Sequence, residues 1–318
     1  MRSEFDFIQN IKSKYGLNRI GDDCAVLPKD GKTDMVITAD MLVEDIDFRL
    51  DWTTPEFLGH KALAVSLSDI AAMGATPTWA MLSMGITKDI WNSDFVDRFY
   101  EGWFTLAKHH GVELVGGDVS RTSGKIVFDS IVAGDIPKGK AILRSGAKPG
   151  DSIFVTGDLG GATSGLMMLE SGFRYGNSDK SRREMLAKQL SPIPRVETGK
   201  YLLEHGIATA MIDLSDGLSS DLNHLCTASG VGARINAKKI PICPALFEIN
   251  EVRDQVMELA LNGGEDFELL FTSREKKVSH AKLPEFSRIG EVTANTGMIE
   301  VIDGGETAFL SSKGYRHF

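Results

Sequence analysis

The sequence feature that most constrains this chain is the segment Met211–Leu222, in which an apolar run ends abruptly in acidic, hydroxyl and glycine residues. The pattern predicts a buried strand that passes directly into a helix continued by Leu218 and Leu225. Ser215 or Asp216 is expected to cap this helix. A calcium-binding EF-hand loop is excluded because its required glycine and glutamate are missing. The segment is therefore either a helix cap or a magnesium site.

Length and charge limit the classes of protein to which the chain can belong. Its 318 residues are enough for two domains of about 150 residues each or for one large domain. Acidic residues outnumber basic ones by 44 to 35, which gives a net charge of -9, and no run of lysine and arginine offsets it. A nucleic acid or an anionic membrane would be repelled, and we expect neither as a partner.

No segment of the sequence predicts export or membrane insertion. The N-terminus lacks an apolar signal core, and no stretch reaches about 18 consecutive apolar residues. The three cysteines, Cys24, Cys226 and Cys243, are far apart, which argues against a disulfide framework and a zinc site. The histidines show no metal-ligand spacing. A cytoplasmic protein with buried thiols is expected.

Several further carboxylates stand beside glycines or inside apolar elements. Asp23 follows a glycine turn, and Asp40 interrupts residues 35–43, a β-branched run typical of a buried strand. Residues 59–74 predict a helix that is apolar on almost every face, yet Asp69 lies within it. Because an ionised carboxylate in a protein core needs a cation or hydrogen-bond donors, these positions indicate either metal binding or ion pairs.

Two glycine-rich segments bear on phosphate binding. Gly116–Asp118 is expected to end a strand at residues 112–115, where the glycines would let a phosphate approach the backbone amides and the aspartate would hold its metal. Gly134–Ala141 matches a P-loop except at its last position, where Ala141 lacks the magnesium-binding hydroxyl. We interpret this second segment as the linker between two halves of the chain.

Taken together, the acidic positions favour phosphate chemistry with hard cations. Carboxylate oxygens are ligands that suit magnesium. An acidic protein can bind a polyanion only when divalent ions stand between the two sets of negative charge, so binding of a nucleoside triphosphate would depend on magnesium. The six carboxylates are Asp23, Asp40, Asp69, Asp118, Asp213 and Asp216.

Six motifs occur in the order in which they occur in the thiamine-monophosphate kinase family. They are Gly21–Asp23, Thr38–Asp40, Leu67–Ala75, Gly116–Asp118, Asp213–Gly217 and Gly263–Asp266. Through these motifs nearly the whole chain resembles this family. The wider superfamily includes aminoimidazole ribonucleotide synthetase and selenophosphate synthetase.

The resemblance implies a mixed α/β (α+β) fold with two PurM-like domains. Residues 1–137 would form an N-terminal α/β domain whose mixed sheet dimerises. Residues 138–318 would form a C-terminal α+β domain that completes the site for ATP and substrate. ATP would bind between the domains of a homodimer and pass its γ-phosphate directly to thiamine monophosphate. The chain would then be a magnesium-dependent phosphotransferase of thiamine diphosphate synthesis.

The resemblance also implies roles for individual residues. Asp47, which stands where the family usually has a histidine, is expected to bind thiamine monophosphate together with Glu265 and Tyr315. A carboxylate suits an aminopyrimidine or a cation, and an aromatic face can stack on the thiazolium. The expected ATP contacts are Gly117, Asp118, Arg144 and Ser215. The expected metal ligands are Asp23, Thr38, Ala39 through its backbone, Asp40, Asp69, Asp118, Asp213 and Asp216.

The expected mechanism uses no residue as a general base. A phosphate monoester has a second pKa near about 6, so the acceptor oxygen is already largely anionic at neutral pH. Repulsion between two anions is then the main obstacle to transfer. The aspartates are therefore expected to bind several magnesium ions for in-line transfer rather than to accept protons.

Two other functions are also compatible with the sequence. One is another ATP-dependent synthetase of the same superfamily, of the aminoimidazole ribonucleotide or selenophosphate type. A selenophosphate synthetase would need a reactive cysteine in a mobile N-terminal segment, whereas Cys24 lies inside a predicted strand. The other is a non-catalytic nucleotide-binding protein with the same magnesium site.

Overall fold

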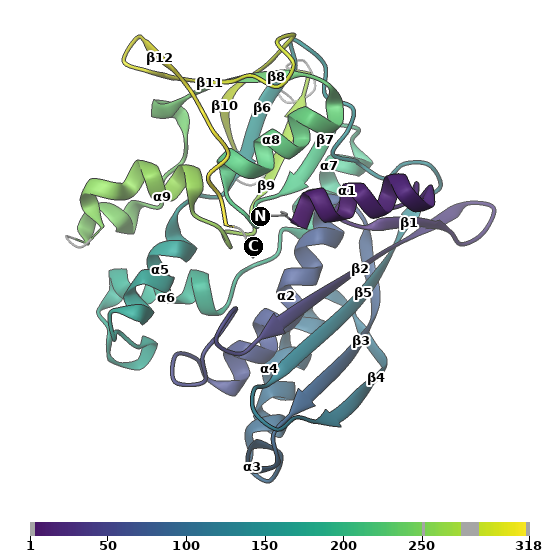
Figure 1. The fold of residues 1–318 in the computed structure, drawn as a ribbon, viewed down its shortest axis with the longest axis vertical. Helices are drawn as coiled ribbons and strands as arrows, with labels where there is room; N and C mark the ends of the chain where they lie inside the picture. The colour runs from purple at the N-terminus through teal and green to yellow at the C-terminus, as the bar shows by residue number, and fades with distance from the viewer. Residues whose placement is uncertain (1–3, 250–251, 275–285, 316–318) are drawn as a thin grey trace.

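The chain folds around two separate β-sheets, which occupy the lower and upper halves of Figure 1. This computed structural model describes residues 4–249, 252–274 and 286–315. Both sheets are flanked by helices, so the predicted fold of two mixed α/β units is confirmed. Among the helices in the described ranges, none is both long enough and apolar enough to cross a membrane.

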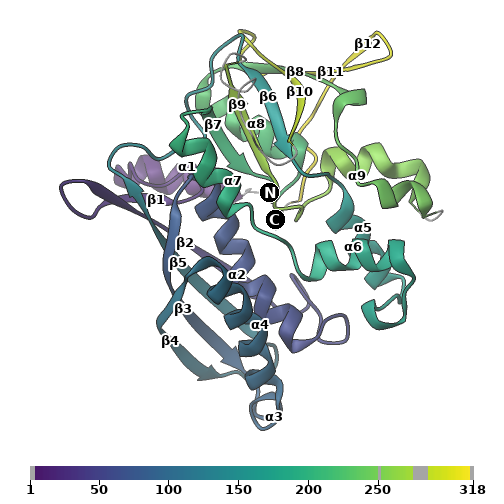
Figure 2. The same ribbon diagram turned by 180° about the vertical axis from the view of Figure 1, so that it is seen from behind.

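The first sheet is mixed and belongs to the N-terminal half. In spatial order it consists of β1 (Ala25–Pro28), β2 (Thr33–Val43), β5 (Val127–Pro137), β3 (Thr76–Ile86) and β4 (Glu113–Arg121). Neighbouring strands are antiparallel except β3 and β4, which are parallel. The helices of this half are α1 (Glu4–Tyr15), α2 (Pro55–Ala72), α3 (Lys88–Trp91) and α4 (Phe95–His110). Helices α2 and α4 pack on each other and cover one face of the sheet (Figure 2).

The second sheet belongs to the C-terminal half. In spatial order it consists of β12 (Glu306–Phe309), β11 (Ile299–Asp303), β8 (Gly232–Asn236), β10 (Phe286–Thr293), β6 (Ser152–Thr156), β9 (Leu269–Ser273) and β7 (Ala208–Asp213). Its described pairings are antiparallel except that of β11 with β8. The accompanying helices are α5 (Gly161–Glu170), α6 (Lys180–Leu190), α7 (Val196–Glu204), α8 (Leu218–Ser229) and α9 (Val256–Asn262).

Helix α2 is buried between the two halves. It contacts β2, β3, β5 and α4 of the N-terminal half and also α7 and β7 of the C-terminal half. Leu63, Leu67 and Ile70 are fully buried as a result. A Cβ atom on Gly199 of α7 would lie 2.0 Å from the carbonyl oxygen of Ala71, so the two helices meet backbone to backbone. The apolar character on almost every face of α2 follows from this position.

The expected end of the strand before Gly116–Asp118 is wrong. Strand β4 continues through these residues to Arg121 and pairs with β3 along this length. The glycine has a packing role, because a Cβ atom on Gly117 would lie 1.9 Å from the carbonyl oxygen of Leu82 on β3. The predicted linker Gly134–Ala141 likewise begins inside a strand, since β5 ends at Pro137.

The expected cap of the helix after β7 is also wrong. Helix α8 has Gly217 as its N-cap residue, at φ 108°, and neither Ser215 nor Asp216 caps it. Instead, Asp221 Oδ2 accepts hydrogen bonds from the backbone N–H groups of Asp216 at 3.2 Å and Gly217 at 3.0 Å. A carboxylate inside the first turn therefore satisfies the N–H groups at the start of the helix.

We expect Gly102→Ala to destabilise the protein by about 1–3 kcal/mol, because overpacking moves the backbone of well-packed elements. A Cβ atom at Gly102 of α4 would lie 1.9 Å from the carbonyl oxygen of Glu56 on α2. Urea denaturation measures the change in the free energy of unfolding. Gly124→Ala is the control, since a Cβ atom there meets nothing within 4 Å. Helix propensity alone would make the Gly102→Ala variant more stable than the wild type. Such an increase in stability would contradict the close contact between the helices.

Candidate active site

Three carboxylates from distant parts of the chain meet at the junction of the two halves. Asp23 precedes β1, Asp69 lies on α2, and Asp213 ends β7. One oxygen of each carboxylate lies within 4.8 Å of an oxygen of the other two. We call Asp23, Asp69 and Asp213 the carboxylate cluster. The structure thus brings together three of the residues that the sequence predicts as metal ligands.

Hydroxyl groups orient these carboxylates and that of the neighbouring Asp40. Thr38 Oγ1 on β2 donates a hydrogen bond of 2.5 Å to Asp69 Oδ2. Ser68 Oγ on α2 donates one of 2.7 Å to Asp213 Oδ2. Ser66 Oγ, also on α2, donates one of 2.7 Å to Asp40 Oδ2. These hydroxyls fix the direction of the carboxylates, but they bring no positive charge.

Burial and mutual repulsion disfavour the ionised forms of these acids. Burial raises the pKa of Asp40 to about 6. Burial together with the charge of Asp23 raises the pKa of Asp213 to about 7. The pKa of Asp69 is raised well above its usual range by burial and then by the Asp40 and Asp213 carboxylates. The site therefore favours any added positive charge.

The donor set fits a hard divalent cation. Asp23 Oδ2 is buried and has no hydrogen-bond partner among the described residues. This oxygen atom is therefore available to bind a cation. Carboxylate and hydroxyl oxygens are the ligands that magnesium prefers. Ala39 lies between Thr38 and Asp40 on β2, where successive side chains point to opposite faces, so only its backbone can face the same side.

Arg144 brings a guanidinium group to the cluster. Its Nη2 and Nε atoms donate hydrogen bonds of 2.6 Å and 3.2 Å to Asp23 Oδ1. Its backbone N–H donates one of 2.7 Å to Asp22 Oδ1. Burial raises the pKa of Asp23, while this ion pair acts to lower it. The predicted ATP contact is therefore placed directly beside a predicted metal ligand.

A pocket of about 400 Å³ lies between the two halves beside these acids. Its N-terminal wall includes Asp40 and Asp47, and Asp47 Oδ2 accepts a hydrogen bond of 2.7 Å from the backbone N–H of Val43. Its C-terminal wall includes Ser215, Asp216 and the predicted substrate residues Glu265 and Tyr315. The structure therefore gathers the three predicted substrate residues in one pocket.

Glu265 has two partners that the sequence reasoning missed. Lys61 Nζ on α2 lies 2.8 Å from Glu265 Oε1, and the Lys61 side chain is almost fully buried. Gln189 Nε2 on α6 donates a hydrogen bond to Glu265 Oε2. A lysine inside an otherwise apolar helix was the available signal for the first of them. No signal existed for Gln189, because α6 has no clear apolar face.

Gly117 and Asp118 are not brought to the cluster within one chain. They lie on the edge strand β4, and β3 and β5 separate β4 from β2. Asp118 pairs with Ser83, whereas Asp40 shares the opposite, helix-covered face with Leu82 and Ser130. Three strand spacings amount to roughly 14 Å. Their predicted roles thus require a route other than contact inside one chain.

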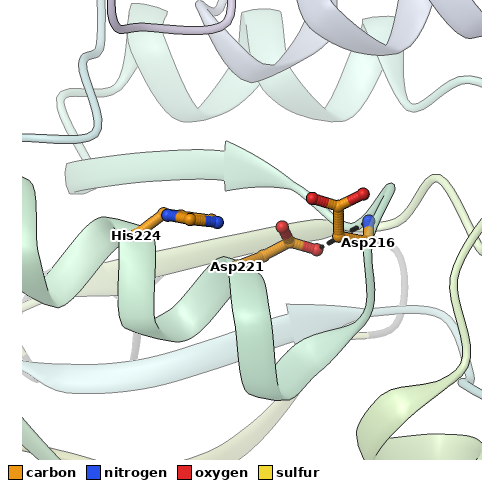
Figure 3. A group of neighbouring side chains, drawn as sticks. All are labelled: Asp216, Asp221 and His224. Carbon is orange, nitrogen blue, oxygen red and sulfur yellow. Dashed lines mark hydrogen bonds between the residues drawn. The ribbon is translucent and has the colours of Figure 1, made fainter. Parts of the chain in front are cut away.

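A second group of possible ligands lies at the start of α8. Asp216, Asp221 and His224 each offer an atom within 4.8 Å of the others. Figure 3 shows His224 on the same helix as Asp221, one turn further along, with Asp216 at the preceding loop. Asp221 and His224 are three residues apart, so their side chains lie on one face of the helix. This spacing joins an aspartate to a histidine, and it was missed because only spacings between histidines were considered. Asp221 already serves the helix start, so its role is at least partly structural.

The raised pKa values predict how the stability of the metal-free protein depends on pH. A carboxyl group whose pKa is raised in the folded state favours folding in its protonated form. Its contribution to the free energy of unfolding is complete below the pKa that it has in the unfolded chain, about 4. It is lost as the pH rises through about 6 for Asp40 and about 7 for Asp213. Thermal unfolding with a chelator should give a lower midpoint near about pH 8 than near about pH 5.5.

Asp213→Asn should weaken this pH dependence and stabilise the metal-free protein near about pH 8 by on the order of 1 kcal/mol. Asp89→Asn, at an exposed position, is the matched control and should leave the pH dependence unchanged. An Asp213→Asn variant with the same pH dependence as the wild type would contradict the electrostatic account of the cluster.

Comparison with known proteins gives matches over both halves of the chain. The family model of the AIR synthase related protein N-terminal domain matches residues 21–136, and that of the C-terminal domain matches residues 148–303. Thiamine-monophosphate kinase of Escherichia coli K12 is 39% identical over 321 residues, which cover 99% of this chain and 95% of that protein. The Bacillus subtilis enzyme of the same name is 35% identical over 328 residues, 99% of each chain.

Solved structures agree with these sequence matches. The structure of AaThiL complexed with AMPPCP and TMP aligns with a TM-score of 0.89 at 32% identity, over 99% of this chain and 97% of that one. Thiamine monophosphate kinase from Aquifex aeolicus aligns with a TM-score of 0.83 at 31% identity, over 94% of this chain and 97% of that one. The matched residues include both walls of the pocket, and the chain therefore belongs to the thiamine-monophosphate kinase family of AIR synthase related proteins.

Proposed function

We propose that this chain transfers the γ-phosphate of ATP to thiamine monophosphate, giving thiamine diphosphate and ADP. The observation that carries the proposal is the carboxylate cluster at the junction of the two halves, where Asp40, whose charge acts on Asp69 and Asp213, lines a pocket with walls from both halves. The named activity of relatives at 35–39% identity and the AMPPCP and TMP of the AaThiL complex support it.

The residues present would hold magnesium and position phosphates. Magnesium bound by the cluster with Thr38, the Ala39 backbone, Asp40 and Asp216 would neutralise the charge of the phosphates during transfer. Arg144 carries a fixed guanidinium group at the same place and can clamp a phosphate oxygen. Ser215 lines the pocket and offers a hydroxyl to ATP. No residue needs to act as a general base, because the acceptor phosphate is already ionised near neutral pH.

The pocket suits the organic part of thiamine monophosphate. Tyr315 lines the pocket with an aromatic ring, and the pKa of its hydroxyl is raised by burial and then by Asp47, Glu265 and Asp216. These three carboxylates line the same pocket as the Tyr315 ring, on which a cationic thiazolium can stack. The backbone N–H of Tyr315 donates a hydrogen bond of 3.2 Å to the carbonyl oxygen of Asp216, which links the substrate residue to the metal side.

A second copy of the chain would complete the site with Gly117 and Asp118. In the described part of the chain, β1 pairs only with Asp34–Ile37 of β2, so the edge of β2 from Thr38 onward has no strand beside it. Strand β4 has the other open edge of the same sheet. Exposed Met41 and Met81 mark the face away from the helices as apolar. Pairing β4 of one copy with β2 of the other would close both edges and bring the segment with Gly117 and Asp118 next to the strand that carries Thr38 and Asp40 of the partner.

Complementation between inactive variants tests this arrangement. Asp118→Asn and Asp213→Asn should each be inactive alone, because each removes a ligand from every site. Mixed dimers would contain one site with both aspartates intact, so a refolded equal mixture should recover about a quarter of the wild-type activity. Continued inactivity of a mixture whose mixed dimers are verified by mass spectrometry would exclude a shared site.

The reaction itself is tested by phosphorus NMR of the protein with ATP, magnesium and thiamine monophosphate. We expect a new diphosphate ester, and Asp213→Asn should lower kcat by at least about 100-fold. Asp89→Asn is the control and should retain full activity, because Asp89 is exposed at the start of the short helix α3. ATP binding without any diphosphate ester would instead identify a nucleotide-binding protein.

The selenophosphate alternative is disfavoured by Cys24. The thiol is buried, and its pKa is raised well above the usual value by burial and then by the charges of Asp69 and Asp23. A nucleophilic cysteine needs a thiolate in an electropositive and accessible environment. Cys24 has the opposite environment, so it cannot supply the reactive thiol that this alternative requires.

A further inference from the structure

Gln189 lines the pocket and carries a buried acceptor without a partner among the described residues. It lines the pocket from α6, and its side chain is almost fully buried. Its Nε2 atom donates to Glu265 Oε2, which fixes the orientation of the amide because a carboxylate accepts only from the nitrogen side. Its Oε1 atom is buried and has no hydrogen-bond partner among the described residues. A buried acceptor of this kind costs free energy until a donor reaches it.

Lys61 and Glu265 hold this amide in place. Lys61 Nζ forms an ion pair of 2.8 Å with Glu265 Oε1, and only 5% of the Lys61 side chain is exposed. The negative charge of Glu265 is thus balanced inside the protein. Glu265 also has φ 65°, a left-handed conformation that places its side chain in this position at some cost in backbone energy. The group is therefore built to present a neutral acceptor rather than a net charge.

One face of α2 connects this group with the carboxylate cluster. Lys61, Val65 and Asp69 follow one another at intervals of four residues, so they lie along the same face of the helix. Val65 lines the pocket between the two polar ends. Eight residues of helix span about 12 Å. Along this face of α2, Val65 therefore separates the group of Lys61, Glu265 and Gln189 from Asp69 of the carboxylate cluster.

We propose that Gln189 is a specificity residue whose Oε1 accepts a hydrogen bond from the amino group of the substrate's pyrimidine. Lys61 is a positioning residue that holds Glu265, and through it Gln189, in the required orientation. This inference rests on the proposed function for the identity of the substrate. The inference adds that the protein recognises the pyrimidine amino group and thereby distinguishes the substrate from analogues that lack this group.

The experiment compares thiamine monophosphate with its analogue in which an oxygen replaces the pyrimidine amino group. Calorimetry measures the binding of each compound without ATP, and steady-state kinetics measures the transfer. The wild type should prefer the amino compound by at least about tenfold in Kd and in kcat/KM. Gln189→Met should remove this preference by weakening only the amino compound, with the KM for ATP unchanged.

Two further variants separate recognition from general damage. Lys61→Met should raise KM for thiamine monophosphate by about tenfold and reduce the preference for the amine, while kcat changes less. Gln255→Met, at an exposed glutamine, should change nothing. Circular dichroism and the unfolding midpoint verify that each variant is folded. The wild-type protein is also tested with both compounds. The preference for the amino compound can therefore be tested even if a variant fails to fold.

The outcomes distinguish this inference from the proposed function. A wild type that binds both compounds equally, or a folded Gln189→Met variant that keeps the preference, would overturn the role of Gln189. Absence of binding of thiamine monophosphate to the wild type would overturn both proposals. Preferential binding of the amino compound without formation of a diphosphate ester would support the role of Gln189 and refute the kinase reaction.

Discussion

The burial of α2 between the two halves is the constraint on which the other features depend. Its apolar faces form part of one continuous core that includes Phe154 and Phe271 of the second sheet. Burial of this apolar surface is the main free-energy gain available to the junction. Because α2 carries Ser66, Ser68 and Asp69 into that core, the polar site is held by a helix that is buried along most of its length.

The electrostatics of the site follow from the same placement. Acids that repel one another can stay close only when packing elsewhere supplies enough free energy to hold them there. The Arg144 guanidinium reduces the imbalance at Asp23, and the hydroxyls of Thr38 and Ser68 reduce the desolvation of their acceptors. The remaining excess of negative charge favours an added cation, which supports the proposed magnesium site.

Much of this arrangement could be predicted from the sequence, because polar residues inside apolar runs are conspicuous. Asp40 within β2 and Asp69 within α2 were identified in this way, and the elements themselves follow from their periodicity. Long-range partners could not be predicted, since Lys61 and Glu265 lie in different halves of the chain. The two glycines of β4 were misinterpreted as a strand end because the structural reason for Gly117, the close approach of β3, is a tertiary contact. Gln189 could not be predicted because its helix α6 has no clear apolar face.

The backbone contact between Gly199 and Ala71 has a consequence for how ligands are received. Helices that touch through their main chains leave no side-chain layer in which one half could slide over the other. This contact therefore opposes sliding of one wall of the pocket over the other. Little conformational entropy is lost when a ligand enters such a pocket, so more of the contact energy is available as affinity. A pair of small residues that do not line the pocket thereby contributes to recognition.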